Sequence, residues 1–170
     1  LSNSLTRAAN LTRTTARDLV VDRVGLECSA VEAAAALDDT DVDVLWSTLN
    51  AHAAAEGLQS LALTDLAFHE AVVGSSGNPV LVLMFGAIRN QVFALMLRSH
   101  SDPSVHRVGE PYHEKIVRAI ADRDPALASE LMREHLELAL NLYGTDLDRP
   151  IAEVVEARGL QSSATLNPSS

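Results

Sequence analysis

The stretch DLAFHEAVVGSSGNP, residues 65–79, decides the fold because it contains the clearest helix boundary in the sequence. Apolar side chains recur at helical spacing in its first half, and Gly74 then ends the helix, since glycine readily adopts the left-handed conformation of helix C-termini. Asn78 caps the next helix, and Pro79 fits its first turn. The stretch therefore predicts two long helices joined by a short turn, which is typical of an antiparallel bundle.

The same signals divide the rest of the chain into helices. Asp124-Pro125 repeats the capping residue followed by proline, whereas Gly109 and Pro111 leave the start of the preceding helix open. The predicted helices span about residues 14–37, 41–56, 58–74, 79–99, 112–122, 125–143 and 150–158. This pattern predicts an all-α fold, an antiparallel helical bundle of six to seven helices.

Length and composition indicate one globular domain. The chain has 170 residues, of which 47% are apolar, enough for one core. We expect the bundle at residues 14–159, a linker or the remnant of another domain at 1–13, and a disordered tail at 160–170. The longest apolar run, at 80–88, is about half the length needed to cross a bilayer, so it predicts a core helix and no membrane partner. Cys28 is the only cysteine and cannot form an internal disulfide, which points to the cytoplasm.

Asp65 and His69 lie four residues apart, so they share one face of the predicted helix 58–74 with apolar side chains. A buried ionisable pair is costly unless another group compensates it. His113 and His135 also share their faces with apolar residues and are expected to point into the core. One divalent ion bound by this carboxylate and three neutral imidazoles would compensate all four groups. Zinc is the predicted ion, with nickel or manganese as alternatives. The metal-free alternative is a structural helical interaction module in which the four groups only hydrogen-bond to one another.

The sequence contains no motif of a catalytic metal site. His69-Glu70 and His113-Glu114 lack the second histidine of HExxH, and each glutamate is rotated by about 100° from its histidine on the helix. We therefore expect no enzyme, with a metal-dependent hydrolase or lyase as the alternative function. The remaining histidines lie near helix ends or beside a proline-containing loop and are expected at the surface: His52, His100 and His106.

Five short motifs follow one another along the chain. They are R-x2-L-E at 23–27, D-x3-H at 65–69, S-G-N-P at 76–79, H-x2-I-x2-A-I-x2-R-D at 113–124 and M-x2-H-L at 132–136. Together they resemble the FCD domain, the ligand-binding domain of FadR-type GntR transcription regulators, over about residues 14–144. The interval between His113 and His135 is similar to that of the metal-binding members of the family.

The resemblance implies a bacterial regulatory domain that binds a small carboxylate or hydroxy acid at a buried metal ion. Binding would modulate operator recognition by a separate winged-helix domain, and the regulator would be a homodimer. Residues 1–13 are too few to form a winged helix, so contact with DNA would come from a domain missing from this chain. The net charge of −10 and the lack of a basic stripe also argue against DNA binding by this chain alone.

Two polar residues are candidates for contacting the effector. Arg23 lies on an apolar-rich side of the first helix and is a candidate to pair with an effector anion. An ion pair with Glu27, one turn further along, is the alternative, which the spacing slightly favours. Asn90, on the helix 79–99, is the second candidate.

Overall fold

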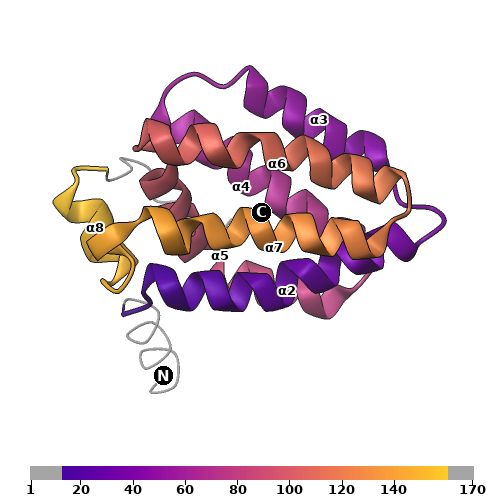
Figure 1. Cartoon of the computed structure of the whole chain (residues 1–170), viewed down its shortest axis with the longest axis horizontal. Helices are drawn as coiled ribbons and strands as arrows, with labels where there is room; N and C mark the ends of the chain where they lie inside the picture. Colours follow the sequence, from indigo (N-terminus) through magenta and orange to yellow (C-terminus); the bar gives the residue numbers. More distant parts are fainter. Residues whose placement is uncertain (1–12, 161–170) are drawn as a thin grey trace, which may run out of the picture.

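The computed structural model describes residues 13–160 and shows seven α-helices, with no β-strand in that range (Figure 1). The helices are α2 (Ala16–Ala36), α3 (Val42–Ala53), α4 (Leu58–Ser75), α5 (Pro79–His100), α6 (Pro103–Ala121), α7 (Pro125–Leu142) and α8 (Ile151–Ala157), and the 3-10 turn η1 (Gly144–Asp146) precedes α8. The prediction of an all-α helical bundle is confirmed. The predicted linker and tail lie outside the described residues, apart from Arg13 and Leu160.

α6 begins earlier than its predicted span of 112–122. Asp102 accepts a backbone hydrogen bond at the first turn and Pro103 occupies that turn, the same start that α5 and α7 use. Pro111 therefore lies inside the helix, where proline costs about 3 kcal/mol because it breaks one backbone hydrogen bond. The cap and the burial of Val105 in the first turn compensate this cost. The helix thus carries residues near its start into the interior of the bundle.

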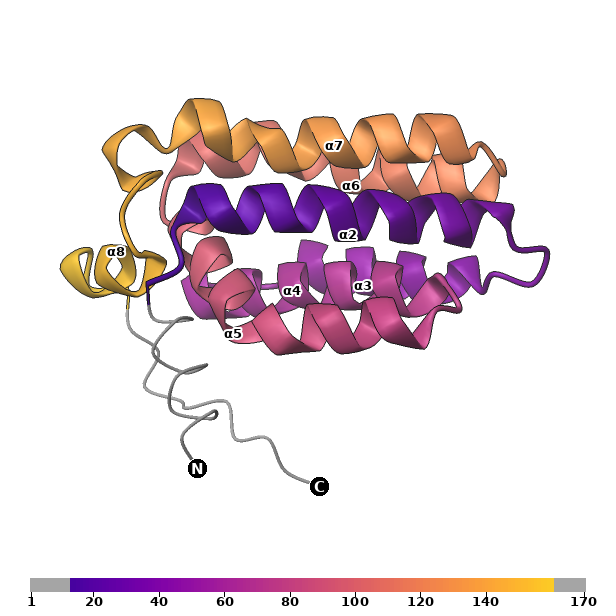
Figure 2. The same cartoon turned by 90° about the horizontal axis from the view of Figure 1, so that it is seen from below.

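α2 runs through the middle of the bundle, between the α6–α7 pair and the α4–α5 pair (Figure 2). One hydrophobic cluster joins α2, α4 and α5 to α8, and a second joins α2, α3 and α4 to α6 and α7. Leu19 belongs to the first cluster and Val31 to the second, so α2 contributes to both. The polar site described below is enclosed by apolar side chains from both clusters, which hold its walls in place.

α5 departs from the core helix expected at 80–88. Phe85 is buried, as is most of the second half of the helix, but four apolar side chains in the first half are exposed: Val80, Val82, Leu83 and Met84. The reason is that α2 and α4 cover one side of α5, which forms the lower edge of the bundle in Figure 2. The helix is long and apolar enough to cross a membrane by length and composition. However, Arg89 and Asn90 lie at its middle and its second half is buried in the bundle.

Candidate metal centre

The structure brings the four predicted ligands together from three helices. Asp65 and His69 come from α4, His113 from α6 and His135 from α7. Asp65 Oδ1 lies 3.4 Å from His69 Nε2 and 3.3 Å from His113 Nε2. His135 Nε2 lies 3.2 Å from His113 Nε2 and 3.4 Å from His69 Nε2. The three imidazoles therefore have ligand atoms within 4.8 Å of one another, and Asp65 Oδ1 adjoins two of them.

These separations fit a small cation. Bonds of about 2.0–2.1 Å in a tetrahedral zinc site place neighbouring ligand atoms about 3.3 Å apart. Asp65 Oδ1 is buried and has no hydrogen-bond partner among residues 13–160. Leaving a buried acceptor unsatisfied costs about 1–3 kcal/mol, and more for a charged one. A cation bound among the four atoms would remove that cost, so the donor set suits a divalent ion.

The protonation states of these groups also suit metal binding. Burial lowers the pKa of His135 to about 3, and burial together with the neighbouring His135 lowers the pKa of His113 well below its usual value. Burial alone would raise the pKa of Asp65, but the hydrogen bond from His100 and the nearby His69 hold that pKa well below its usual range. At neutral pH the centre thus offers a carboxylate and at least two neutral imidazoles.

Glu27 on α2 orients one of the ligands and was not assigned to the centre from the sequence. Its carboxylate is fully buried and accepts hydrogen bonds from His69 Nδ1 and from Arg23 Nε, both at 2.5 Å. Burial raises the pKa of Glu27, but Arg23 and His69 outweigh burial and lower it to about 2. Because Nδ1 of His69 carries the hydrogen, its Nε2 lone pair faces the centre. The sequence signal for this role of Glu27 was its position one turn after Arg23, in a helix with an apolar face.

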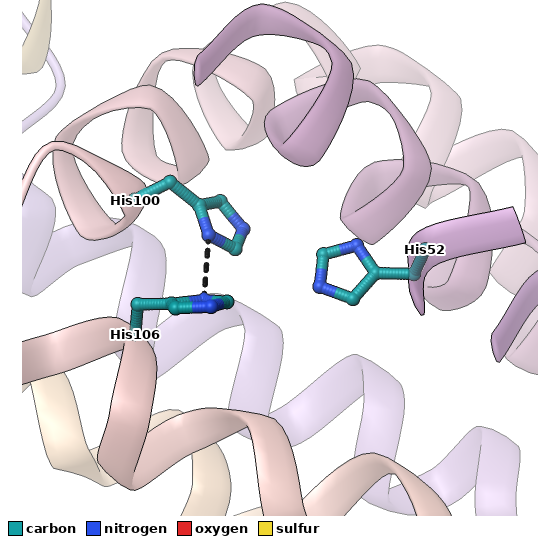
Figure 3. A group of neighbouring side chains, drawn as sticks. All are labelled: His52, His100 and His106. Atoms are coloured by element: carbon teal, nitrogen blue, oxygen red, sulfur yellow. Dashed lines mark hydrogen bonds between the residues drawn. The ribbon is translucent and has the colours of Figure 1, made fainter. Parts of the chain in front are cut away.

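The expectation that the other three histidines lie at the surface is wrong for two of them. His52 is 5% exposed, and His100 is held inside by a hydrogen bond from its Nε2 to Asp65 Oδ2 at 3.0 Å. His106 has the most exposed side chain of the three, at 28%. The ends of α3 and α5 and the start of α6 converge beside the metal centre, so these side chains face one another (Figure 3). Proximity to a helix end in the sequence therefore did not mean contact with solvent.

A pocket of about 60 Å³ adjoins the four ligands. Its wall includes Arg23, both groups of histidines and apolar side chains of α5, α6 and α7. Arg23 is buried and forms the ion pair with Glu27 that the spacing allowed. Asn90 is exposed and lies outside the described lining of the pocket. The helical twist explains this, because α5 turns Leu95 and Met96 toward the pocket and therefore turns Asn90 away from it.

The proposed metal ligands lie in a part of the chain that matches a known protein family. The family model described as FCD domain matches residues 18–138, which include all four predicted ligands and Glu27. A search of curated proteins finds no match to this chain.

Proposed function

This chain belongs to the FCD-domain family, which supplies the regulatory ligand-binding domains of GntR-type transcription regulators, and we propose that it senses a small organic acid at a divalent metal ion. Domains of this family are regulatory modules of transcription factors and not enzymes. The chain would therefore bind its ligand without transforming it. The bundle at residues 14–159 would be the sensor, and a separate winged-helix domain would contact operator DNA.

The four separations of 3.2–3.4 Å among the ligand atoms are the observation that carries the metal assignment. A metal-free arrangement would have to satisfy the same atoms with hydrogen bonds. With its hydrogen on Nδ1, neutral His69 presents its Nε2 lone pair to Asp65 Oδ1 at 3.4 Å. The metal-free alternative places hydrogens on His113 Nε2 and His135 Nε2, which can donate to Asp65 Oδ1 and His69 Nε2. A cation bound by Asp65, His69, His113 and His135 would instead satisfy all four atoms at once, and zinc, nickel and manganese all accept such ligands.

The charge around the proposed ion favours an anionic effector. A divalent ion and the Asp65 carboxylate together carry a charge of about +1, because the imidazole ligands are neutral. Arg23 is already balanced by Glu27 and contributes a donor surface to the pocket wall. In a low-dielectric pocket, an anion is the natural complement to the remaining charge. Carboxylate oxygens bound at the metal would satisfy that charge.

The size of the pocket limits the effector. One buried water occupies about 10–15 Å³ on this scale, so a cavity of about 60 Å³ has room for roughly four to six waters. An acid with a similar number of non-hydrogen atoms fits, which corresponds to a short carboxylate or hydroxy acid. We do not include Asn90 among the effector contacts, since it is exposed and outside the described lining.

The exposed apolar face of α5 supports a homodimer. Leu83 is 75% exposed and Val80 is 59% exposed, and Val21 of α2 nearby is 63% exposed. Burying such residues against a second copy would stabilise a dimer, because each fully buried side chain of this size contributes about 1.5–3 kcal/mol. We place the dimer contact on this face and the regulator in the cytoplasm.

A thermal-shift screen tests the proposed function. Short carboxylic and hydroxy acids are added to the zinc-loaded chain and to the same chain after chelation. An acid at about 100 times its Kd should stabilise the zinc-loaded protein by about 2.7 kcal/mol. The stabilisation should disappear after chelation and in Asp65→Asn.

Glu114→Gln serves as the matched control. Glu114 adjoins a predicted ligand in the sequence, but it is 57% exposed and pairs with Arg118. It should keep the full response to the acid. Equal stabilisation by the best acid with and without metal would contradict the proposal, and turnover of an ester or lactone would support the hydrolase alternative instead.

A further inference from the structure

A second group of histidines lies beside the proposed metal centre, and its hydrogen bonds show which ring nitrogens carry lone pairs. His52 Nδ1 lies 2.8 Å from Thr64 Oγ1. The Thr64 hydroxyl can donate to the backbone carbonyl of Ser60 or of Leu61, at 2.9 and 3.1 Å. A hydroxyl has one hydrogen to donate, so when Thr64 gives it to a carbonyl, His52 Nδ1 is the donor in its contact with Thr64. The lone pair of His52 is therefore on Nε2, which is buried and has no partner in the described part of the chain.

The same reasoning fixes the tautomer of His100. Its Nε2 lies 3.0 Å from Asp65 Oδ2, and an ionised carboxylate can only accept. His100 Nε2 therefore carries the hydrogen, and in the neutral ring Nδ1 carries the lone pair. That Nδ1 points at His106 Nδ1, 3.0 Å away (Figure 3).

His106 completes the group. Its Nε2 lies 3.4 Å from Glu110 Oε2, an acceptor that favours a hydrogen on that nitrogen. With Nε2 protonated, Nδ1 of the neutral ring carries a lone pair directed at the lone pair of His100 Nδ1. Two lone pairs at 3.0 Å repel each other unless a positive charge lies between them. A hydrogen on His106 Nδ1 would join these two nitrogens in an ordinary hydrogen bond, but it would leave the buried Nε2 of His52 without a partner in the described residues.

We propose that His52, His100 and His106 form a second binding site for a divalent transition-metal ion, separate from the centre formed by Asp65, His69, His113 and His135. One ring nitrogen from each of the three lies within 4.8 Å of the others, and Figure 3 shows the His52 ring directed at the space between His100 and His106. A metal ion binds all three lone pairs at once, which one proton cannot do. Three neutral imidazoles suit zinc, copper, nickel and cobalt.

The second ring nitrogen of each histidine supports this assignment. Thr64 Oγ1 and Asp65 Oδ2 accept from His52 and His100, and Glu110 Oε2 lies 3.4 Å from His106 Nε2. Histidines that bind metals almost always donate their other ring nitrogen to such an oxygen, which fixes the tautomer and the ring orientation. His106 is 28% exposed and leaves a route by which an ion can enter from solvent.

Asp65 connects the two sites. Its Oδ1 faces the first centre, and its Oδ2 accepts from His100, a ligand of the second. An ion at the second site would strengthen the polarisation of His100 Nε2–H and so draw charge from Asp65. Both ions would line the same pocket, so an effector acid with two oxygens could contact both.

Metal stoichiometry tests the second site. The 170-residue chain is stripped with a chelator, equilibrated with excess zinc, desalted and analysed for metal, and cobalt absorption spectra are recorded in parallel. Wild-type protein should hold two equivalents. His52→Gln and His106→Gln should each hold one, because losing one of three ligands should weaken the second site by more than about 100-fold, beyond the 10–100-fold that loss of an outer partner causes.

His135→Gln is the matched control, since it removes a ligand of the first centre only and should hold one equivalent at the second. His100 is not replaced, because it contacts Asp65 and would disturb both sites. Circular dichroism of each stripped variant confirms folding. If the wild-type protein holds one equivalent and His135→Gln holds none, the second site is overturned and the proposed function stays intact. If the wild-type protein and His135→Gln each hold one equivalent but His106→Gln holds none, the second site is supported and the first is contradicted. Two equivalents retained in both His52→Gln and His106→Gln would also overturn the second site.

Discussion

Glu27→Gln should weaken both the fold and the metal centre. The substitution keeps the size of the side chain and a hydrogen-bond acceptor for His69, but it removes the charge that balances buried Arg23. Breaking one partner of a buried ion pair costs about 3–5 kcal/mol. The shift of the Glu27 pKa from 4.5 to about 2 corresponds to about 3 kcal/mol, which agrees with that range. We therefore expect the free energy of unfolding of the metal-stripped protein to fall by about 3 kcal/mol.

Metal affinity should fall as well. Glu27 holds the hydrogen on His69 Nδ1 and so directs Nε2 at the centre, and loss of such a partner weakens metal binding by about 10–100-fold. Urea unfolding followed by circular dichroism measures the stability, and competition with a chromophoric chelator measures the zinc affinity.

Glu70→Gln provides the matched control. Glu70 also pairs with an arginine, Arg89, and adjoins His69 in the sequence, but its side chain is 35% exposed. Partly exposed pairs contribute about 0–1 kcal/mol, so this variant should behave like wild type. The double variant Arg23→Met/Glu27→Gln should recover part of the lost stability, since it leaves no unpaired charge. A loss of less than about 1 kcal/mol in Glu27→Gln, with zinc affinity within about threefold of wild type, would refute the reasoning.

Three further predictions concern pH, DNA and assembly. The metal-stripped protein should lose stability as the pH falls from 6.5 toward 3, by about 1.4 kcal/mol per pH unit for His135. The sign follows because the unfolded chain takes up a proton that the buried ring does not, and His113 acts in the same direction. His69 has a raised pKa, so its contribution is already complete below pH 6.5 and changes only at higher pH. A pH-independent urea midpoint would contradict this prediction. The 170-residue chain, with a net charge of −10, should not retard an operator fragment at physiological salt, and a retarded band would show that it carries its own DNA-binding surface. Leu83→Glu should convert the dimer into a monomer in analytical ultracentrifugation, because it places a charge in the proposed apolar contact, and an unchanged dimer would move that contact elsewhere.

The helices could be predicted because their signals are local. Asn78-Pro79 and Asp124-Pro125 fix helix starts through contacts within one turn, so the structure places both helices where the sequence did. The exception was α6, whose start at Pro103 depends on a cap at Asp102 as well as on burial of Val105 against the rest of the bundle. Burial of that kind is set by other helices and cannot be read from one segment.

The surroundings of the centre could be predicted only in part. Asp65 and His69 share a helical face, so their proximity follows from spacing alone. The contact of Glu27 with His69 joins two helices, and so does that of His100 with Asp65. Such contacts depend on how the helices pack, for which no local signal exists, and they account for the misplaced histidines near the pocket.

A crystal structure with anomalous diffraction data collected at the zinc absorption edge tests the central claim most directly. Crystals of the zinc-loaded chain should show a strong anomalous peak about 2.0–2.1 Å from Asp65 Oδ1 and from the Nε2 atoms of His69, His113 and His135. The account would be contradicted if these four atoms showed no peak between them while zinc was bound elsewhere in the crystal. It would also be contradicted if no peak appeared and the histidines hydrogen-bonded directly to one another.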